Sequence, residues 1–136
     1  MREISFTMPI KPQGKARPRF TRTGHAYTPK NTRDYEQTVE LYARRTMDGE
    51  TPFECALRVT IEAVFEPPRS WGKTKRAGFI VFGYPHDKKP DCDNIAKAVL
   101  DALNGIVFLD DKQVTELIVR KRYGESDAVS VTIEAI

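Results

Sequence analysis

The chain has 136 residues, of which 40% are apolar and 30% charged, and these values predict one globular domain rather than a disordered chain or two independent domains. No stretch has the apolar length of a signal peptide or a membrane-spanning helix, so we expect a cytosolic protein that acts without a membrane. The net charge of +3 identifies no partner by itself, and the two cysteines lack the spacing of a zinc site.

The first half of the chain predicts two strands and one helix. Apolar and polar residues alternate over residues 4–10 and again over residues 57–65, which is the period of a half-buried strand. Residues 11–28 hold prolines and glycines among basic and aromatic residues, so we expect a long mobile loop. Asn31 is expected to cap a helix that ends near Asp48.

The middle of the chain predicts one further helix. Residues 69–90 are broken by glycines and prolines and are expected to be mostly loop, with a brief strand at residues 79–82. Residues 94–104 place their apolar side chains on one face of a helix, and Gly105 follows where a left-handed cap belongs.

Two strand patterns close the chain. Residues 114–123 and 129–135 are expected to pair as a hairpin across residues 124–127. Strands at both ends with helices between them predict a single α+β domain spanning residues 1–136, in which a small mixed β-sheet packs with helices.

Acidic residues cluster between positions 91 and 111 of this basic chain. Asp91 and Asp93 stand two apart at a loop-to-helix junction, where extended backbone would direct both carboxylates to one side. Asp93, Lys97 and Asp101 then step by four along the polar face of the predicted helix. Asp111 joins them if the chain doubles back after the helix. Because clustered carboxylates repel one another unless a hard cation compensates them, the cluster predicts a Mg²⁺ site, which Mn²⁺ can also occupy.

Each of these residues also has a purely structural interpretation. Asp93 could cap the helix, its spacing to Lys97 and Asp101 could form surface ion pairs, and Asp110 with Asp111 could form a turn. None of these interpretations explains why so many acids lie together in a basic chain. His25 and His86 are isolated in predicted loops, so we expect them to be solvated or to touch a phosphate.

An ordered motif runs through this region and consists of Asp91-Cys92-Asp93-Asn94, Lys97, Asp101-Ala102-Leu103 and Asp110-Asp111-Lys112-Gln113. It resembles the motif of the RusA-type Holliday junction resolvases, small nucleases of bacteria and their prophages. The resemblance implies that Asp91, Asp93 and Asp111 bind Mg²⁺ and that Lys97 assists catalysis. Asp110, Asp101 and Asn94 support them. It also implies a homodimer that binds a four-way DNA junction and places paired nicks in recombination and repair.

Two basic segments that contain no acid, residues 4–33 and 67–86, flank this motif. We expect their side chains, and two lysines that follow the second segment, to contact DNA phosphates: Lys15, Arg17, Arg19, Arg22, Arg69, Lys73, Lys75, Arg76, Lys88 and Lys89. Phe20 or Tyr27 is available to stack on an unpaired base. The alternative is that the first segment is a solvated surface loop.

Two other functions stay open at this point. The first is a nuclease that prefers another branched DNA, and the second is a non-catalytic DNA-binding module of a mobile element. The basic segments fit both of these functions as well as the leading hypothesis. Only the second predicts that the acids bind no cation.

Overall fold

The computed structural model describes residues 2–136 and contains a four-stranded sheet, three α-helices and a two-stranded arm. The elements are β1 (Glu3–Met8), β2 (Arg19–Phe20), β3 (Ala26–Tyr27), α1 (Lys30–Met47), β4 (Leu57–Phe65), α2 (Lys73–Phe82), α3 (Cys92–Leu103), the 3₁₀ turn η1 (Asp111–Gln113), β5 (Val114–Tyr123) and β6 (Ala128–Ala135). The mixed sheet with helices confirms the predicted α+β class. No helix within the described residues is long and apolar enough to cross a membrane.

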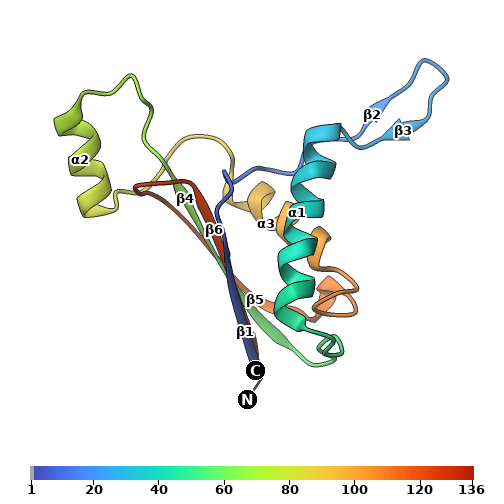
Figure 1. Ribbon diagram of the computed structural model, residues 1–136. Helices are drawn as coiled ribbons and strands as arrows, with labels where there is room; N and C mark the ends of the chain where they lie inside the picture. Colours follow the sequence, from blue (N-terminus) through green and yellow to red (C-terminus); the bar gives the residue numbers. More distant parts are fainter. Residues whose placement is uncertain (1) are drawn as a thin grey trace.

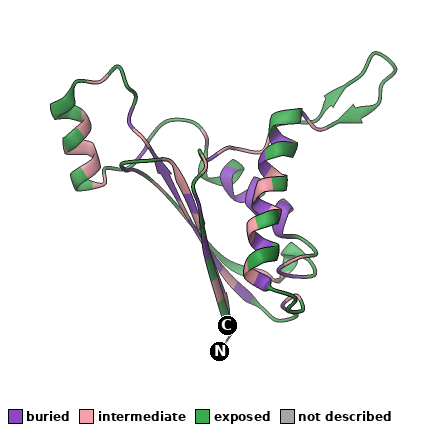
Figure 2. Cartoon of the chain, viewed as in Figure 1, coloured by how far each residue is buried: buried purple, intermediate pink, exposed green. Residues whose placement is uncertain are grey.

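Helices α1 and α3 cover one face of the sheet and enclose the core (Figure 1). The buried stripe of α1 steps by three and four and consists of Thr32, Tyr35, Val39, Ala43 and Met47. The buried face of α3 consists of Ile95, Ala96, Ala98, Val99, Ala102 and Leu103. Figure 2 shows these stripes facing inward, whereas the arm is exposed. The apolar periods in the sequence therefore identify the faces that build the core.

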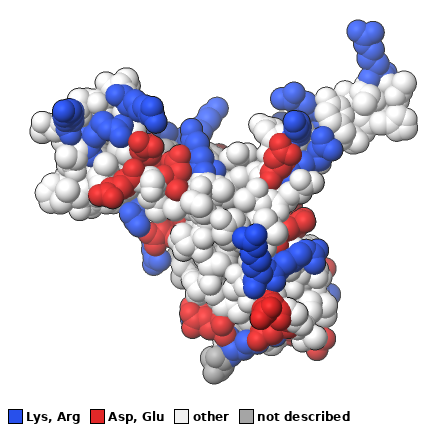
Figure 3. Space-filling model, in the orientation of Figure 1, with Lys and Arg blue, Asp and Glu red and all other residues white. Residues whose placement is uncertain are grey.

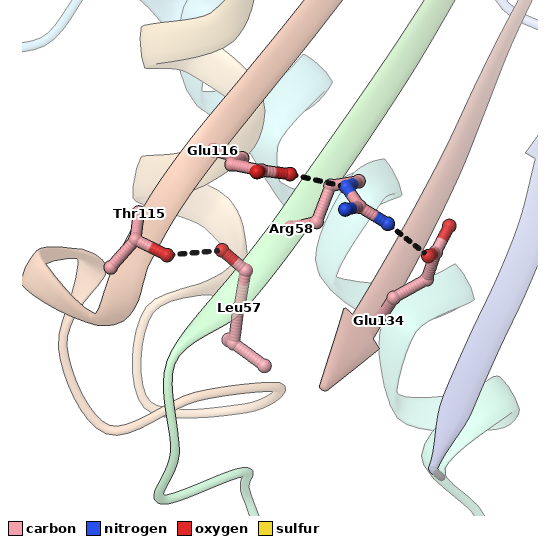
Figure 4. Close-up of polar contacts among 5 residues, drawn as sticks. All are labelled: Leu57, Arg58, Thr115, Glu116 and Glu134. Carbon is pink, nitrogen blue, oxygen red and sulfur yellow. Dashed lines mark hydrogen bonds and ion pairs between the residues drawn. The ribbon is translucent and has the colours of Figure 1, made fainter. Parts of the chain in front are cut away.

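The other face of the sheet carries polar side chains. Arg58 on β4 pairs with Glu116 on β5 and, at 2.9 Å, with Glu134 on β6 (Figure 4). Near the start of β5, the Thr115 hydroxyl donates to the Leu57 carbonyl at 3.4 Å, close to a register shift between β4 and β5. Because exposed ion pairs contribute little to stability, we assign these cross-strand contacts mainly to fixing the register of the strands.

The predicted hairpin between the last two strands is wrong. The strand order is β1-β6-β4-β5, so β4 lies between β5 and β6, parallel to the first and antiparallel to the second. The connection after β5 crosses the end of β4: the Gly124 N–H donates to the Phe65 carbonyl at 3.0 Å, and the Asp127 carboxylate accepts from the Glu66 N–H at 2.9 Å. These bonds to β4 replace the turn of a hairpin.

Gly124 lies where this crossing approaches β4 most closely. A Cβ at this position would lie 2.4 Å from Cγ1 of Val64, a β-branched side chain with little freedom to move. We therefore expect Gly124→Ala to lower the free energy of unfolding by roughly 1–3 kcal/mol, as overpacking does. Urea denaturation measures this, with Gly72→Ala as the control because a Cβ there meets nothing within 4 Å. Equal losses in the two variants would contradict the prediction.

The expectation for residues 69–90 is also wrong, because α2 lies where loop and a brief strand were predicted. No residue of α2 is buried. A helix that does not pack on the core has no apolar stripe in its sequence, so the usual signal of a helix is missing here. Arg76 attaches the helix to the preceding segment by donating to the Pro68 carbonyl at 2.8 Å and pairing with Glu66 at 3.2 Å. In Figure 1, α2 stands apart from the sheet.

The expected loop of residues 11–28 includes a short regular arm. Strands β2 and β3 pair antiparallel, with Arg19 opposite Tyr27, and the arm projects beyond the start of α1 (Figure 1). Phe20 on this arm is 70% exposed, which leaves its ring free to meet a partner.

Of the two predicted ends of α1, only the C-terminal end is confirmed. Pro29 occupies the N-cap position, so Asn31 does not cap the helix; its side chain accepts from the neighbouring Thr32 N–H at 3.1 Å. The helix ends as predicted at Asp48, whose left-handed φ of 47° precedes Gly49.

His86 is buried, which corrects the expectation that it is solvated. Its ring stacks on Phe65 with the centroids 3.7 Å apart, and its Nδ1 has no hydrogen-bond partner among the described residues. Desolvation, aided by the positive charge of Lys121, lowers the pKa of this imidazole below its ordinary value of 6.5.

This lowered pKa predicts that the fold loses stability as the pH falls below about 6.5. In that range an unfolded His86 binds a proton that the folded one does not, so protonation favours the unfolded state, whereas above it the stability is fully present. We expect His86→Phe, which keeps the stack, to flatten this dependence. Urea midpoints at about pH 7.5 and 5.5 measure it, with the exposed His25→Phe as the control. If both variants show the same change of urea midpoint with pH as the wild type, burial of His86 does not cause the pH dependence of stability.

Candidate functional site

Two acidic side chains stand at the start of α3. Asp91 is the N-cap residue, with φ −70° and ψ 151°, and Asp93 lies in the first turn. The helix dipole favours negative charge at this end. Asp91 makes no side-chain capping bond, and within residues 2–136 neither carboxylate takes part in an ion pair. Both exposed carboxylates are therefore available to a ligand.

The backbone here differs from two expectations. Asp93 lies in the helix and not in extended backbone. The alternation of side chains along a strand therefore does not direct the carboxylates of Asp91 and Asp93 to the same side. Asp93 is also not the cap, because Asp91 holds that position. The predicted helix itself is confirmed, starting at Cys92, and Gly105 after its end adopts the predicted left-handed φ of 81°.

Strand β5 holds the segment that leads into Asp91. The Lys121 ammonium donates to the Pro90 carbonyl at 2.8 Å and to the Lys88 carbonyl, and the His86 N–H donates to the Lys121 carbonyl at 3.1 Å. Sequence reasoning missed Lys121, because its partners are distant in the chain and only the sheet brings them together. Lys121 therefore acts as a positioning residue for the start of α3.

A second acidic group lies at the far end of α3. Asp101 is 3.2 Å from the Lys15 ammonium, which also pairs with Glu36 on α1. Partial desolvation, the hydrogen bond and charge of Asp110, and the charge of Asp101 raise the pKa of Asp111, although the residue is exposed. A carboxylate with such neighbours gains from a cation that compensates the charge. Glu36 is a member of this group that the motif did not indicate.

Asp110 and Gln113 shape the turn between α3 and β5. The Lys112 N–H donates to the Asp110 carboxylate at 2.9 Å, which lowers the pKa of Asp110, and the Gln113 side chain accepts from the Asp110 N–H at 3.0 Å. These bonds form a capping box. Gln113 also donates to the Phe53 carbonyl at 2.8 Å. The interpretation of Asp110 as a turn residue is thus confirmed.

The three carboxylates expected to share Mg²⁺ do not form a metal-binding group within one chain. Residues 2–136 contain no set of three acidic, histidine or cysteine side chains that could hold a metal ion. Asp93 and Asp101 are eight residues apart, about 12 Å along a helix axis. Of these two carboxylates, it is Asp101 whose charge helps to raise the pKa of Asp111. The chain therefore presents two acidic groups, one at each end of α3. The pair of Asp91 and Asp93 still suits Mg²⁺, which binds through one or two carboxylates plus water and phosphate oxygens.

Lys97 lies between these two groups on the exposed face of α3. It lines a hollow of about 400 Å³ together with Asn94, Asp101 and, from the base of the arm, Lys15 and Arg17. The surface ion pairs considered for Lys97 are not formed among the described residues; Asp101 pairs with Lys15 instead. The Lys97 ammonium is therefore free to meet a phosphate.

The predicted phosphate-binding residues divide by their environment. Lys15 and Arg76 are bound to groups of the protein itself. The exposed members are Arg17, Arg19 and Arg22 on the arm, Arg69, Lys73 and Lys75 in or near α2, and Lys88 and Lys89 before Asp91. Figure 3 shows Lys and Arg side chains on both upper projections of the molecule, over α2 and along the arm, with a hollow between the projections.

Comparison with known proteins decides the family. The profile of the family described as Endodeoxyribonuclease RusA matches residues 9–134, which include the arm, α2 and both acidic groups. This chain belongs to the RusA family. A relative described as "Uncharacterized protein YqaN", from Bacillus subtilis (strain 168), is 31% identical over 142 residues, which cover 98% of this chain and 96% of that protein.

Membership of the RusA family confirms the resemblance seen in the motif. The protein is a DNA endonuclease, a hydrolase of phosphodiester bonds. The alternative of a non-catalytic DNA-binding module is therefore wrong.

Proposed function

We propose that this RusA-family nuclease resolves four-way DNA junctions in recombination and repair, depends on Mg²⁺ and acts as a homodimer that places paired nicks. The supporting observation is the pair of exposed carboxylates at the start of α3, which have no ion-pair partner within residues 2–136. Lys88 and Lys89 lie just before this pair, separated from it by Pro90, and Lys97 follows Asp93 by one helical turn. Acids for a cation beside lysines for phosphates are the combination that phosphodiester hydrolysis needs.

Each side chain has a distinct role in this proposal. Asp91 and Asp93 would hold Mg²⁺, or Mn²⁺ in its place, and the bound ion supplies an acidified water and a positive charge at the phosphate. Lys97 would contact the phosphate oxygens on which negative charge develops. Asn94 borders the same hollow and would orient the strand. Lys121 would keep Asp91 in place through the Pro90 carbonyl.

The division of the acids supports the homodimer. A twofold axis alongside α3, which leaves the Lys97 face open to DNA, would bring the end of the helix in one subunit to its start in the partner subunit. Asp91 and Asp93 of one subunit would then meet Asp111 of the partner subunit, which completes the three-carboxylate set that one chain does not form. Leu109, 57% exposed beside Asp110, is available to such an interface.

The substrate would lie across the hollow between α2 and the arm. Exposed arginines of the arm and lysines of α2 face DNA from two sides, as a branched substrate with several duplex arms requires. Phe20 at the arm would stack on a base at the branch point.

Cleavage of synthetic DNA by the purified protein with Mg²⁺ tests this function. We expect symmetric nicks in a four-way junction, and little cleavage of linear duplex or of a flap made from the same sequences. Preferential cleavage of flaps or duplex would assign the protein a different substrate. Nicks that need no divalent cation would overturn the metal assignment.

A further inference from the structure

We propose that the groove between α2 and the end of β5 holds an unpaired nucleobase of the DNA, close to the phosphate that is cut. This inference rests on the proposed function in taking DNA as the ligand. The groove has a volume of about 530 Å³, within the range of small-ligand sites, and aromatic rings and lysines line it. Neither Trp71 nor the other aromatic residues of the groove belong to the motif of acids and lysine.

The rings of the groove form ready-made stacking surfaces. Trp71 packs against Phe79 with centroids 4.8 Å apart, and Phe79 packs edge-on against Tyr123 at 5.3 Å. The contact between Phe79 and Tyr123 joins α2 to the end of β5, although no residue of the helix is buried. Tyr84, also in the groove, is 45% exposed. Base stacking on such rings tolerates every base, because each base has a π-face.

A cation occupies one of these surfaces in the free protein. The Lys75 ammonium lies 3.9 Å from the centroid of the Trp71 ring. An aromatic base can replace this ammonium on the ring face, and the released Lys75 can then pair with the phosphate of the same nucleotide. Lys88 lines the groove as well. The single acidic residue in the lining of the groove is Asp87.

The groove is also close to the candidate cleavage site. Lys88 is three residues from Asp91, which limits their separation to about 11 Å. A stacked strand advances about 3.4 Å per nucleotide, so a base beside Lys88 would lie roughly three nucleotides from a phosphate at Asp91. An adjoining hollow of about 420 Å³ shares Trp71, Lys88 and Tyr123 and adds Lys89. The strand thus has a basic path from the groove to the acids.

Trp71 is the only tryptophan of the chain, so its fluorescence reports on the groove directly. We expect a single-stranded oligothymidylate, and a four-way junction, to quench this fluorescence in EDTA, where no cleavage occurs. A duplex of the same length should quench it far less. Equal quenching by duplex would overturn the proposal, as would the absence of any response to the single strand.

Variants separate stacking from general charge. For single-stranded DNA, Lys75→Ala and Lys88→Ala should each reduce the slope of log affinity against log salt by about 0.7. Trp71→Ala should weaken binding by roughly 5- to 150-fold, measured through 2-aminopurine in the DNA, with thermal unfolding to verify the fold. Arg45→Ala, an exposed charge in the last turn of α1, is the matched control. If the lysine variants behave like Arg45→Ala, the groove does not bind the strand.

The fluorescence test and the junction-cleavage test can fail separately. Junction cleavage in Mg²⁺ without fluorescence quenching in EDTA would refute the nucleobase site and leave the nuclease assignment intact. Quenching by single strands without junction cleavage would support the groove and refute the junction-resolving function.

Discussion

Replacing Asp93 with Asn is expected to reduce Mg²⁺-dependent nicking of a four-way junction by roughly 10²- to 10³-fold or more. The amide keeps the size of the side chain but removes the negative charge that would attract the ion. Because Asp93 is exposed in the first turn of α3 and forms no ion pair within residues 2–136, its replacement should leave the fold intact. Single-turnover cleavage in Mg²⁺ measures the loss.

Junction affinity in EDTA should stay the same or rise, because the variant removes a negative charge that faces the phosphates. Asp34→Asn, which removes an exposed carboxylate on α1, is the matched control and should keep the wild-type cleavage rate. If Asp93→Asn cleaves junctions at the wild-type rate, Asp93 is not a metal ligand and the site must be sought elsewhere.

Mixing two inactive variants is expected to restore cleavage if each site is built from two subunits. In a heterodimer of Asp93→Asn and Asp111→Asn, one site collects both substitutions and the other collects none. Random exchange of equal amounts makes half of the dimers heterodimers, so about a quarter of the wild-type sites should reappear. These heterodimers should nick one strand of the junction rather than two.

A site contained within one chain predicts the opposite result, because every subunit of the mixture would carry one inactivating change. Absence of recovery after verified subunit exchange would therefore refute the shared site. Mixing Asp91→Asn with Asp93→Asn is the internal control. Both residues belong to the same end of the same helix, so neither model predicts recovery from that pair.

Local sequence patterns predicted most of the elements that build the core. The alternation in β1, β4, β5 and β6, and the apolar faces of α1 and α3, are visible because side chains of one face repeat every two residues in a strand and every three or four in a helix. The motif likewise predicted the family and the acids, since Asp91, Asp93, Lys97 and Asp101 are close in the chain.

Features that depend on contacts between distant residues were missed. Helix α2 leaves no buried stripe in the sequence, because it is held by the rings of Trp71, Phe79 and Tyr123 and by Arg76. The same contacts create the aromatic groove. Its residues come from positions 71–88, in and around α2, and from Tyr123 at the end of β5, so no local pattern announces it.

The sequence by itself determined the α+β class, the core faces, the family and the positions of the acids in the RusA-type motif. Only the tertiary structure decided how they are arranged. The sheet inserts β4 between β5 and β6. At the end of β4 the Gly124 N–H donates to the Phe65 carbonyl and the Glu66 N–H donates to the Asp127 carboxylate, contacts that no local pattern in the sequence announces. The rigid length of α3 separates Asp93 from Asp101, and the turn at Asp110 leaves Asp111 near Asp101. A helix fixes spacing along its axis, whereas a sequence motif records only order.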